Sequence, residues 1–122
     1  MTSTTINQSS KINRTALYCR VATANQYDTN SIDNQLSRLR SFAETQGFSG
    51  FTEYVDNGFS GLTLDRPELT RLTADIEAGK ISTVVAISTD RIARSYILAS
   101  EWLKRINACN VDLMLLYTPN RH

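Results

Sequence analysis

The stretch ISTVVAIS, residues 81–88, is a continuous apolar run bounded by polar segments. A strand that is apolar along its length, rather than at alternate positions, is buried on both faces. Such burial is typical of a parallel sheet covered by helices. This stretch therefore predicts a central strand of an α/β domain.

The segment before it, DRPELTRLTADIEAG at residues 65–79, predicts a helix with marked ends. Asp65 is the expected N-cap, Pro67 lies in the first turn, and Glu68 can complete a capping box. Gly79 is expected to end the helix. Apolar residues at helical spacing form one face that we expect to be buried: Leu69, Leu72 and Ile76.

The rest of the chain continues the alternation of strands and helices. Strands are expected at residues 15–22, 50–56 and 111–118. Helices are expected at residues 31–47, where Ser31 can cap the start, and at residues 96–109. The first of these has one apolar face: Ile32, Leu36, Leu39 and Ala43. The order β-α-β-α-β-α-β predicts a three-layer α/β domain of flavodoxin-like appearance, with a central four-stranded, mostly parallel sheet.

Length and composition bound the class of protein. The 122 residues, 41% of them apolar, suit one small domain with its own core. No apolar run is long enough to span a membrane. Residues 1–14 are expected to be a disordered polar tail without a secretory signal, which favours the cytoplasm, and residues 119–122 a short C-terminal tail.

Charge and residue types exclude several kinds of site. The formal net charge is only +1, which is not the signature of a domain that holds DNA by charge alone. Cys19 and Cys109 lie far apart without metal-ligand spacing, and the single histidine is His122, the last residue. We therefore expect no zinc site and no histidine-dependent triad, and we interpret both cysteines as small buried hydrophobes.

Ligands of parallel α/β sheets bind beyond the carboxyl ends of the strands. At these ends the sequence places four arginines and one acid: Arg20, Arg66, Arg91, Arg94 and Asp90. Converging guanidiniums suit a phosphoryl group, since they can hold its non-bridging oxygens and offset charge that builds in a transition state.

Each of these residues also has a structural explanation. Arg91 or Arg94 could be a solvated arginine at a helix start, and Asp90 could cap the helix that follows it. Arg66 lies at a helix N-terminus, where a cation is unfavourable against the helix dipole. Arg20 is the strongest candidate, because an arginine inside an apolar strand needs a partner or a ligand.

The nucleophile is the missing part of such a site. No Walker loop is present, and no acidic cluster is suited to Mg²⁺. A phosphoryl transfer here would use arginines in place of a metal and would need a side-chain nucleophile. The residue in the polar turn after the first strand, where a nucleophile is expected, is Ala22.

Several motifs carry a family resemblance: YCRVA at residues 18–22, SIDNQLSRLRSFAETQGF at 31–48, YVDNGFSGLTLDRPELTRL at 54–72, DIEAGKI at 75–81 and DRIAR at 90–94. In this order and spacing they resemble the N-terminal catalytic domain of the serine recombinases, the resolvase/invertase family. Within that family the sequence resembles most the large transposon and phage integrase branch. Residues 15–118 are expected to form that domain.

The resemblance implies a chemistry and assigns roles to residues. It implies a mostly parallel α/β fold and strand exchange on DNA through a 5′-phosphoserine link, without a metal or a cofactor. Ala22 occupies the position of the nucleophilic serine. The other matching active-site positions are Arg20, Gln26, Arg66, Asp90, Arg91 and Arg94, with Asp56, Ser60 and Thr23 in supporting places.

Two departures from the family pattern limit what this chain is expected to do. A methyl group at Ala22 cannot attack phosphorus, and the neighbouring Thr23 points to the opposite face of an extended chain and matches the family's own threonine. The sequence also stops before the family's dimerisation helix and DNA-binding domain. Duplex DNA and self-association are therefore expected of a full-length parent, and the isolated chain is expected to be mainly monomeric.

Two main hypotheses remain open. The first is the catalytic domain of a site-specific recombinase that is inactive as written. The second is a non-catalytic module that binds a phosphate, or pairs with full-length recombinases and interferes with them. A longer parent gene with serine at position 22 favours the first, and a natural gene with Ala22 and a stop after His122 favours the second. A general anion-binding α/β domain is a weaker third reading, because it gives no reason for all the motifs to occur together.

Overall fold

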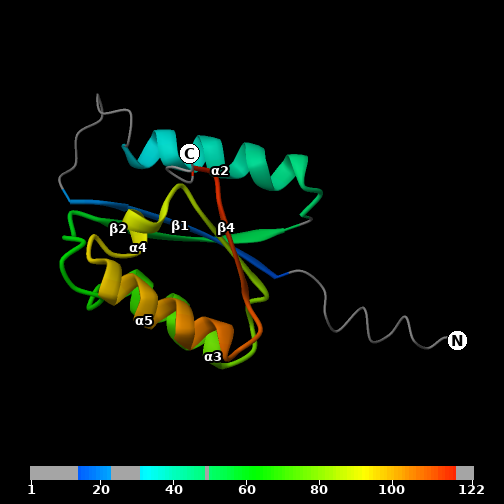
Figure 1. Ribbon diagram of the computed structural model, residues 1–122. Helices are drawn as coiled ribbons and strands as arrows, with labels where there is room; N and C mark the ends of the chain where they lie inside the picture. Colours follow the sequence, from blue (N-terminus) through cyan, green and yellow to red (C-terminus); the bar gives the residue numbers. More distant parts are fainter. Residues whose placement is uncertain (1–13, 23–30, 49, 118–122) are drawn as a thin grey trace, which may run out of the picture.

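The computed structural model describes residues 14–22, 31–48 and 50–117. It contains the expected alternation of strands and helices, with one further helical turn after the third strand (Figure 1). In chain order the elements are β1 (Thr15–Val21), α2 (Ile32–Thr45), β2 (Phe51–Asn57), α3 (Pro67–Glu77), β3 (Thr83–Ala86), α4 (Thr89–Ile92), α5 (Tyr96–Asn107) and β4 (Asp112–Leu115).

The four strands form one parallel sheet in the order β2-β1-β3-β4. Tyr18 of β1 lies opposite Tyr54 of β2 and opposite Ala86 of β3. The two central strands, β1 and β3, are buried along their whole length. The prediction of a four-stranded, mostly parallel α/β sheet is confirmed, although β3 is shorter than the apolar stretch that predicted it.

Helices cover both faces of the sheet (Figure 1). On one face, Leu39 and Ala43 of α2 pack with Leu17 and Cys19 of β1. On the other face, α3 and α5 enclose a larger core, whose main side chains are Tyr18, Tyr54, Leu69, Leu72, Ile76, Trp102 and Ile106. The side chains of β1 supply both cores because successive residues of a strand point to opposite faces.

The start of α3 differs from the prediction. Asp65 is exposed and is not the N-cap; the helix begins at Pro67, and the residue before it makes no side-chain cap. The N–H groups of Glu68 and Leu69 donate instead to the two carboxylate oxygens of Asp56, each at 2.9 Å. Asp56 lies on β2, so a buried carboxylate from another element replaces the local cap that the sequence suggested.

The order of the strands creates a crevice at one end of the sheet. From β1 the chain runs to β2 on one side, and it then returns to β3 on the other side of β1. The connections that follow β1 and β3 therefore lead to different faces of the sheet. Ligands of open α/β sheets bind at such a switch point, beyond the carboxyl ends of the strands.

Some expectations fall on residues that the structure does not describe. These are Gln26, Thr23 and both tails, residues 1–13 and 118–122. Within the described ranges, each helix is too short or too polar to cross a lipid bilayer.

Candidate active site

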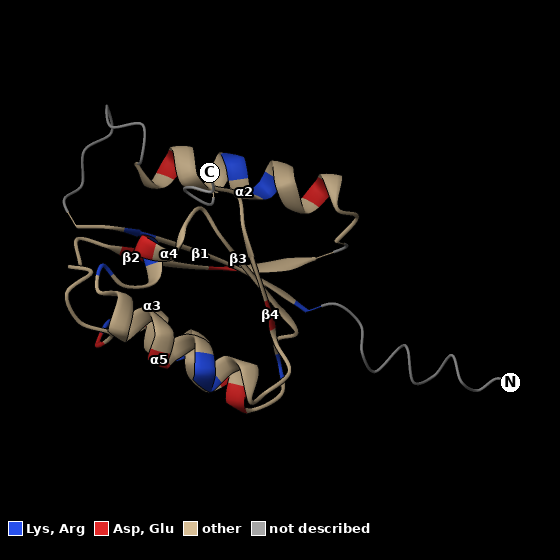
Figure 2. Ribbon diagram, in the orientation of Figure 1, with Lys and Arg blue, Asp and Glu red and all other residues tan. Residues whose placement is uncertain are grey.

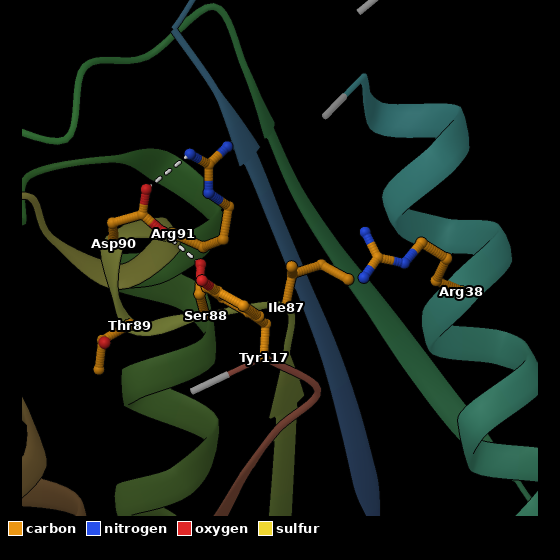
Figure 3. A pocket seen from close by; sticks show the side chains of 7 residues that line it. All are labelled: Arg38, Ile87, Ser88, Thr89, Asp90, Arg91 and Tyr117. Carbon is orange, nitrogen blue, oxygen red and sulfur yellow. Dashed lines mark hydrogen bonds and ion pairs between the residues drawn. The ribbon is translucent and has the colours of Figure 1, made fainter. Parts of the chain in front are cut away.

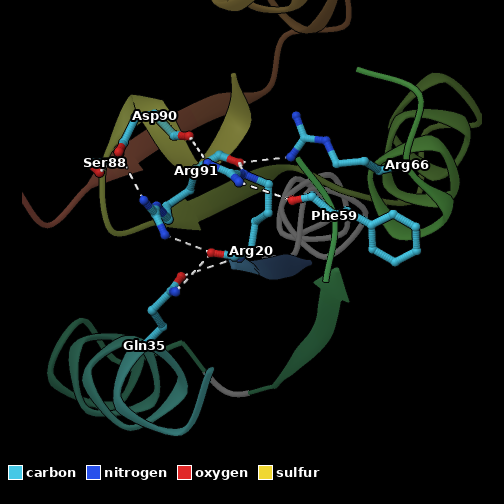
Figure 4. A network of polar contacts seen from close by, with 7 residues as sticks. All are labelled: Arg20, Gln35, Phe59, Arg66, Ser88, Asp90 and Arg91. Carbon is cyan, nitrogen blue, oxygen red and sulfur yellow. Dashed lines mark hydrogen bonds and ion pairs between the residues drawn. The ribbon is translucent and has the colours of Figure 1, made fainter. Parts of the chain in front are cut away.

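Arg20 is a buried arginine on β1, only 2% exposed. Its guanidinium donates to three main-chain carbonyls: Nε to Arg91 at 3.0 Å, Nη1 to Phe59 at 3.1 Å and Nη2 to Asp90 at 2.7 Å (Figure 4). Burial lowers the pKa of this guanidinium, and the nearby positive charges of Arg91 and Arg66 lower it further. The partner that an arginine in an apolar strand requires is thus the protein's own backbone.

Arg66 is the second buried guanidinium, 1% exposed. It donates to the Thr63 carbonyl at 3.1 Å, to the Tyr18 hydroxyl at 2.9 Å and to the Arg91 carbonyl at 3.0 Å. Its Nη2 donates to the Ile92 carbonyl. The Arg91 carbonyl therefore accepts hydrogen bonds from both buried guanidiniums.

These two guanidiniums hold the one-turn helix α4. A helix this short leaves its last carbonyls without partners inside the helix. The carbonyls of residues 90, 91 and 92 accept from the buried arginines instead. The buried pair thus fixes the segment that carries the more exposed charges of the site.

Arg91 and Asp90 form an ion pair at the surface of the site, with 3.0 Å between Nη2 and Oδ2. Arg91 Nη1 also donates to the Arg20 carbonyl at 2.8 Å, and the Ser88 hydroxyl donates to the Asp90 carboxylate. Partial burial acts to raise the pKa of Asp90, but the hydrogen bonds from Arg91 and Ser88 outweigh it and lower the pKa. Asp90 thus pairs with an arginine, and the interpretation of Asp90 as a cap for the next helix is wrong, because Ser95 caps α5.

Gln35 is a buried polar residue of α2 that the sequence analysis missed. Its amide nitrogen donates to the Arg20 carbonyl at 3.0 Å, and its amide oxygen accepts from the Arg20 N–H at 3.4 Å. The Val21 carbonyl points to β2, where it accepts the Gly58 N–H. Because successive residues of a strand direct their peptide groups to opposite sides, the N–H and carbonyl of Arg20 point toward β3. Since β3 has already ended at Ala86, the Gln35 amide takes the place of the missing strand. The signal in the sequence was a glutamine within the apolar face of the predicted helix.

Gly61 allows the loop after β2 to pack directly on the arginines. A Cβ atom on Gly61 would lie 2.6 Å from Cγ of Arg94 and 2.8 Å from Nη2 of Arg20, which is too close for either contact. The Gly61 carbonyl accepts the Arg94 N–H at 2.9 Å. Arg94 is exposed, and no residue in the described part of the chain pairs with its guanidinium. The loop thus brings Arg94 beside Arg20 and leaves the Arg94 side chain available to a ligand.

The remaining site residues lie at the same end of the sheet. Ala22 is exposed, two residues beyond Arg20 at the carboxyl end of β1. Asp56 is buried and, besides capping α3, accepts from the Tyr18 hydroxyl at 2.7 Å, so its contacts are structural. Ser60 is exposed, and its hydroxyl accepts an N–H of its own loop at 3.0 Å. An anion at this end would meet the exposed Arg94 and the partly buried Arg91, with two buried guanidiniums behind them.

Sequence comparison shows which known proteins this chain resembles. Residues 15–121 match the family profile described as "Resolvase, N terminal domain". Over 80 residues the chain is 39% identical to a putative DNA recombinase of Bacillus subtilis (strain 168). That match covers 65% of this chain but only 15% of the relative.

Solved structures agree with this result. The N-terminal catalytic domain of TP901-1 integrase is similar with a TM-score of 0.80 and 36% identity, over 85% of this chain and 78% of that one. A resolvase family site-specific recombinase from Streptococcus pneumoniae is similar with a TM-score of 0.71 and 28% identity, over 85% of this chain and 72% of that one. The C-terminal catalytic domain of ISC1926 TnpA, an IS607-like serine recombinase, has a TM-score of 0.77 at 20% identity, over 89% of this chain and 71% of that one, and supports the fold alone.

Proposed function

The chain belongs to the resolvase family, as a catalytic-type domain of the site-specific serine recombinases, and from this premise we propose that it holds a DNA phosphate among its arginines without a nucleophile of its own. The proposed reaction of an active parent is phosphoryl transfer from DNA to a serine hydroxyl at position 22. Because this chain has Ala22, we propose that it forms no covalent link to DNA.

The observation that carries the proposal is an exposed methyl group next to a complete polar network. Ala22 follows Arg20 by two positions, so in an extended chain the two side chains belong to the same face. Arg20, Asp90 and Arg91 are joined by hydrogen bonds at this strand end. This arrangement supports the proposal of a phosphate site that lacks the reacting oxygen.

The proposed chemistry in an active parent is a single displacement at phosphorus. The serine oxygen bonds to phosphorus, the bond from phosphorus to the 3′ oxygen of the strand breaks, and the serine proton is released to a base. Guanidiniums stabilise the charge that develops on the phosphoryl oxygens. We propose Arg94, whose side chain is exposed, and Arg91, whose side chain is 15% exposed, as its first contacts, with ionised Asp90 orienting Arg91.

Arg20 and Arg66 are proposed to act indirectly, by holding the segment that carries Arg91. Each donates to main-chain carbonyls of α4, and Arg20 also donates to the carbonyl of Phe59. Arg20 can reach a phosphate only if one of its carbonyl partners gives up a hydrogen bond. We therefore propose that binding DNA shifts α4 or the Phe59 loop, and that the geometry described here is the unliganded arrangement.

The experiment that tests the proposal restores the hydroxyl. Ala22→Ser and the alanine form are compared in a parent-length protein that carries the family's DNA-binding parts. After incubation with its recombination site and denaturation, the serine form is expected to leave a covalent protein–DNA adduct and the alanine form none. Adding Arg91→Gln to the serine form is expected to slow adduct formation about 100-fold or more, the usual effect of removing one charge-stabilising donor.

An adduct formed by the alanine form would contradict this assignment. The hydroxyl would then have to come from another residue, and Thr23 would be examined first. If the serine form made no adduct while still binding the site tightly, position 22 would not be the nucleophile position.

A second candidate is a non-catalytic module that interferes with active recombinases. It is favoured by the completeness of the network, since Arg20 and Arg66 are satisfied by the chain's own groups and need neither nucleophile nor substrate. Added in excess to a recombination assay of an active relative, the chain would then lower product yield with rising concentration. No inhibition at a large excess would favour the first candidate.

A further inference from the structure

A pocket of about 450 Å³ lies beyond the carboxyl end of β3, beside the arginine site. Its walls come from α2, from the segment between β3 and the end of α4, and from Tyr117, the second residue after β4. The lining residues are Arg38, Ile87, Ser88, Thr89, Asp90, Arg91 and Tyr117 (Figure 3). Its volume is within the range of pockets that bind small organic ligands.

The pocket lies at the switch point of the sheet, where β1 and β3 send their connections to different faces. It shares Arg91 and Asp90 with the proposed phosphate site. A strand of DNA whose phosphate lay on the Arg91 guanidinium would therefore have a neighbouring nucleotide within reach of this pocket.

Arg38 is a cation that lines the pocket. Its neighbour on α2, Arg40, binds Glu53 of β2 with 2.5 Å between Nε and Oε2. Arg38 has no such partner within the described residues. Figure 2 shows basic residues in the middle of α2 and acidic residues near its two ends. The Arg38 side chain reaches from the helix toward Ile87 (Figure 3). An unpaired guanidinium facing a pocket suits a phosphate, which it can bind with two hydrogen bonds.

Tyr117 supplies an aromatic face. The residue is 56% exposed, although its backbone is held by a hydrogen bond from its N–H to the Ile87 carbonyl at 2.8 Å. The ring is therefore anchored at the pocket but uncovered. An exposed aromatic ring that lines the same pocket as an arginine offers the two groups on which unpaired nucleotides bind. The hydroxyls of Ser88 and Thr89 add hydrogen-bonding groups at the edge of the same space.

We propose that this pocket binds one unpaired nucleotide of a DNA strand, with the phosphate on Arg38 and the base against Tyr117. The inference rests on the proposed function in taking DNA as the ligand. A base within an intact duplex is stacked and paired and cannot enter such a pocket. The pocket therefore selects a nucleotide that has left the duplex, as happens next to a broken strand.

The experiment titrates the chain with a thymidine tetranucleotide at low salt. Binding is followed by the NMR signals of the Ile87 methyl groups and the Tyr117 ring. Arg38→Gln is expected to raise Kd about tenfold, the size of one lost arginine–phosphate contact. Arg40→Gln is the matched control, because it makes the same change in charge on the same helix away from the pocket, and it is expected to change Kd less than about twofold.

Tyr117→Leu separates a nucleotide from a bare anion. It is expected to raise Kd for the tetranucleotide about tenfold, since a stacking contact is lost. Weak binding of inorganic phosphate should depend on Arg38 but not on Tyr117. The same bases in a blunt duplex are expected to leave the Ile87 and Tyr117 signals unmoved.

Two results would overturn the proposal: equal effects of the Arg38 and Arg40 variants, or equal binding of duplex and single strand. These measurements require no strand cleavage, so a failure of Ala22→Ser to form an adduct leaves them unaffected and the two proposals can fail separately.

Discussion

At position 61 the chain needs a residue without a side chain, because Arg20 and Arg94 occupy the space that a Cβ atom would take. Gly61→Ala is expected to push the loop away from both arginines. The free energy of unfolding should fall by about 1–3 kcal/mol, as in other overpacked sites. Urea denaturation followed by the fluorescence of Trp102, the single and buried tryptophan, measures this change.

Gly50→Ala is the matched control for this substitution. A Cβ on Gly50 would meet nothing within 4 Å, and the backbone there is outside the left-handed region. Its free energy of unfolding is expected to stay level or rise by up to about 1 kcal/mol, because alanine restricts the unfolded chain. Equal losses in the two variants would contradict the close approach of the loop to the arginines.

At the scale of elements, α3 starts on a carboxylate that another element supplies. Asp56→Ala removes the acceptor of two N–H groups of α3 and of the Tyr18 hydroxyl, all close to the core. The free energy of unfolding is expected to fall by about 2–4 kcal/mol, since these donors are left without a partner. Asp65→Ala, at the locally predicted cap, is expected to lower it by about 0.5 kcal/mol through the helix dipole alone. Thermal denaturation of the two variants side by side shows which carboxylate caps α3. A larger loss of stability for Asp65→Ala than for Asp56→Ala would show that Asp65 is the cap.

The contrast between Asp56 and Asp65 also shows how far the sequence could predict the fold and the site. The buried face of α3 was predictable because Leu69, Leu72 and Ile76 recur at a spacing that belongs to the helix itself. Asp56 and Gln35 bind backbone groups of other elements that would otherwise lack a partner. Which groups these are depends on how distant elements pack, so the local sequence pattern could not predict it. For the same reason the sequence pointed to Arg20 as a phosphate ligand but could not show that α4 would bring carbonyls to it.

At the scale of the whole molecule, the two cores contain acids that burial keeps protonated. Burial raises the pKa of the Cys19 thiol from 9.0 to about 12. Burial, with the hydrogen bond to Asp75, raises the pKa of Tyr54 from 10.0 to about 12. Burial also raises the pKa of Tyr18, against the opposing charge of Arg66. All three groups keep their protons in the folded chain at a pH where the unfolded chain loses them.

The stability of the chain should therefore fall at alkaline pH. Each group contributes stability that is fully present below its unfolded pKa and is lost as the pH rises toward its folded pKa. The fall should begin near the unfolded value of Cys19, 9.0, and steepen near the tyrosine value, 10.0. Each titrating group adds about 1.4 kcal/mol per pH unit to the slope.

Urea denaturation between about pH 7 and pH 11 measures this slope, in the chain and in Cys19→Ala. The variant should be less stable at neutral pH because of the cavity, but its decline should begin about one pH unit later, since Tyr18 and Tyr54 are the two of these three groups that it keeps. A decline that began at the same pH in both proteins would show that the Cys19 thiol does not control the onset.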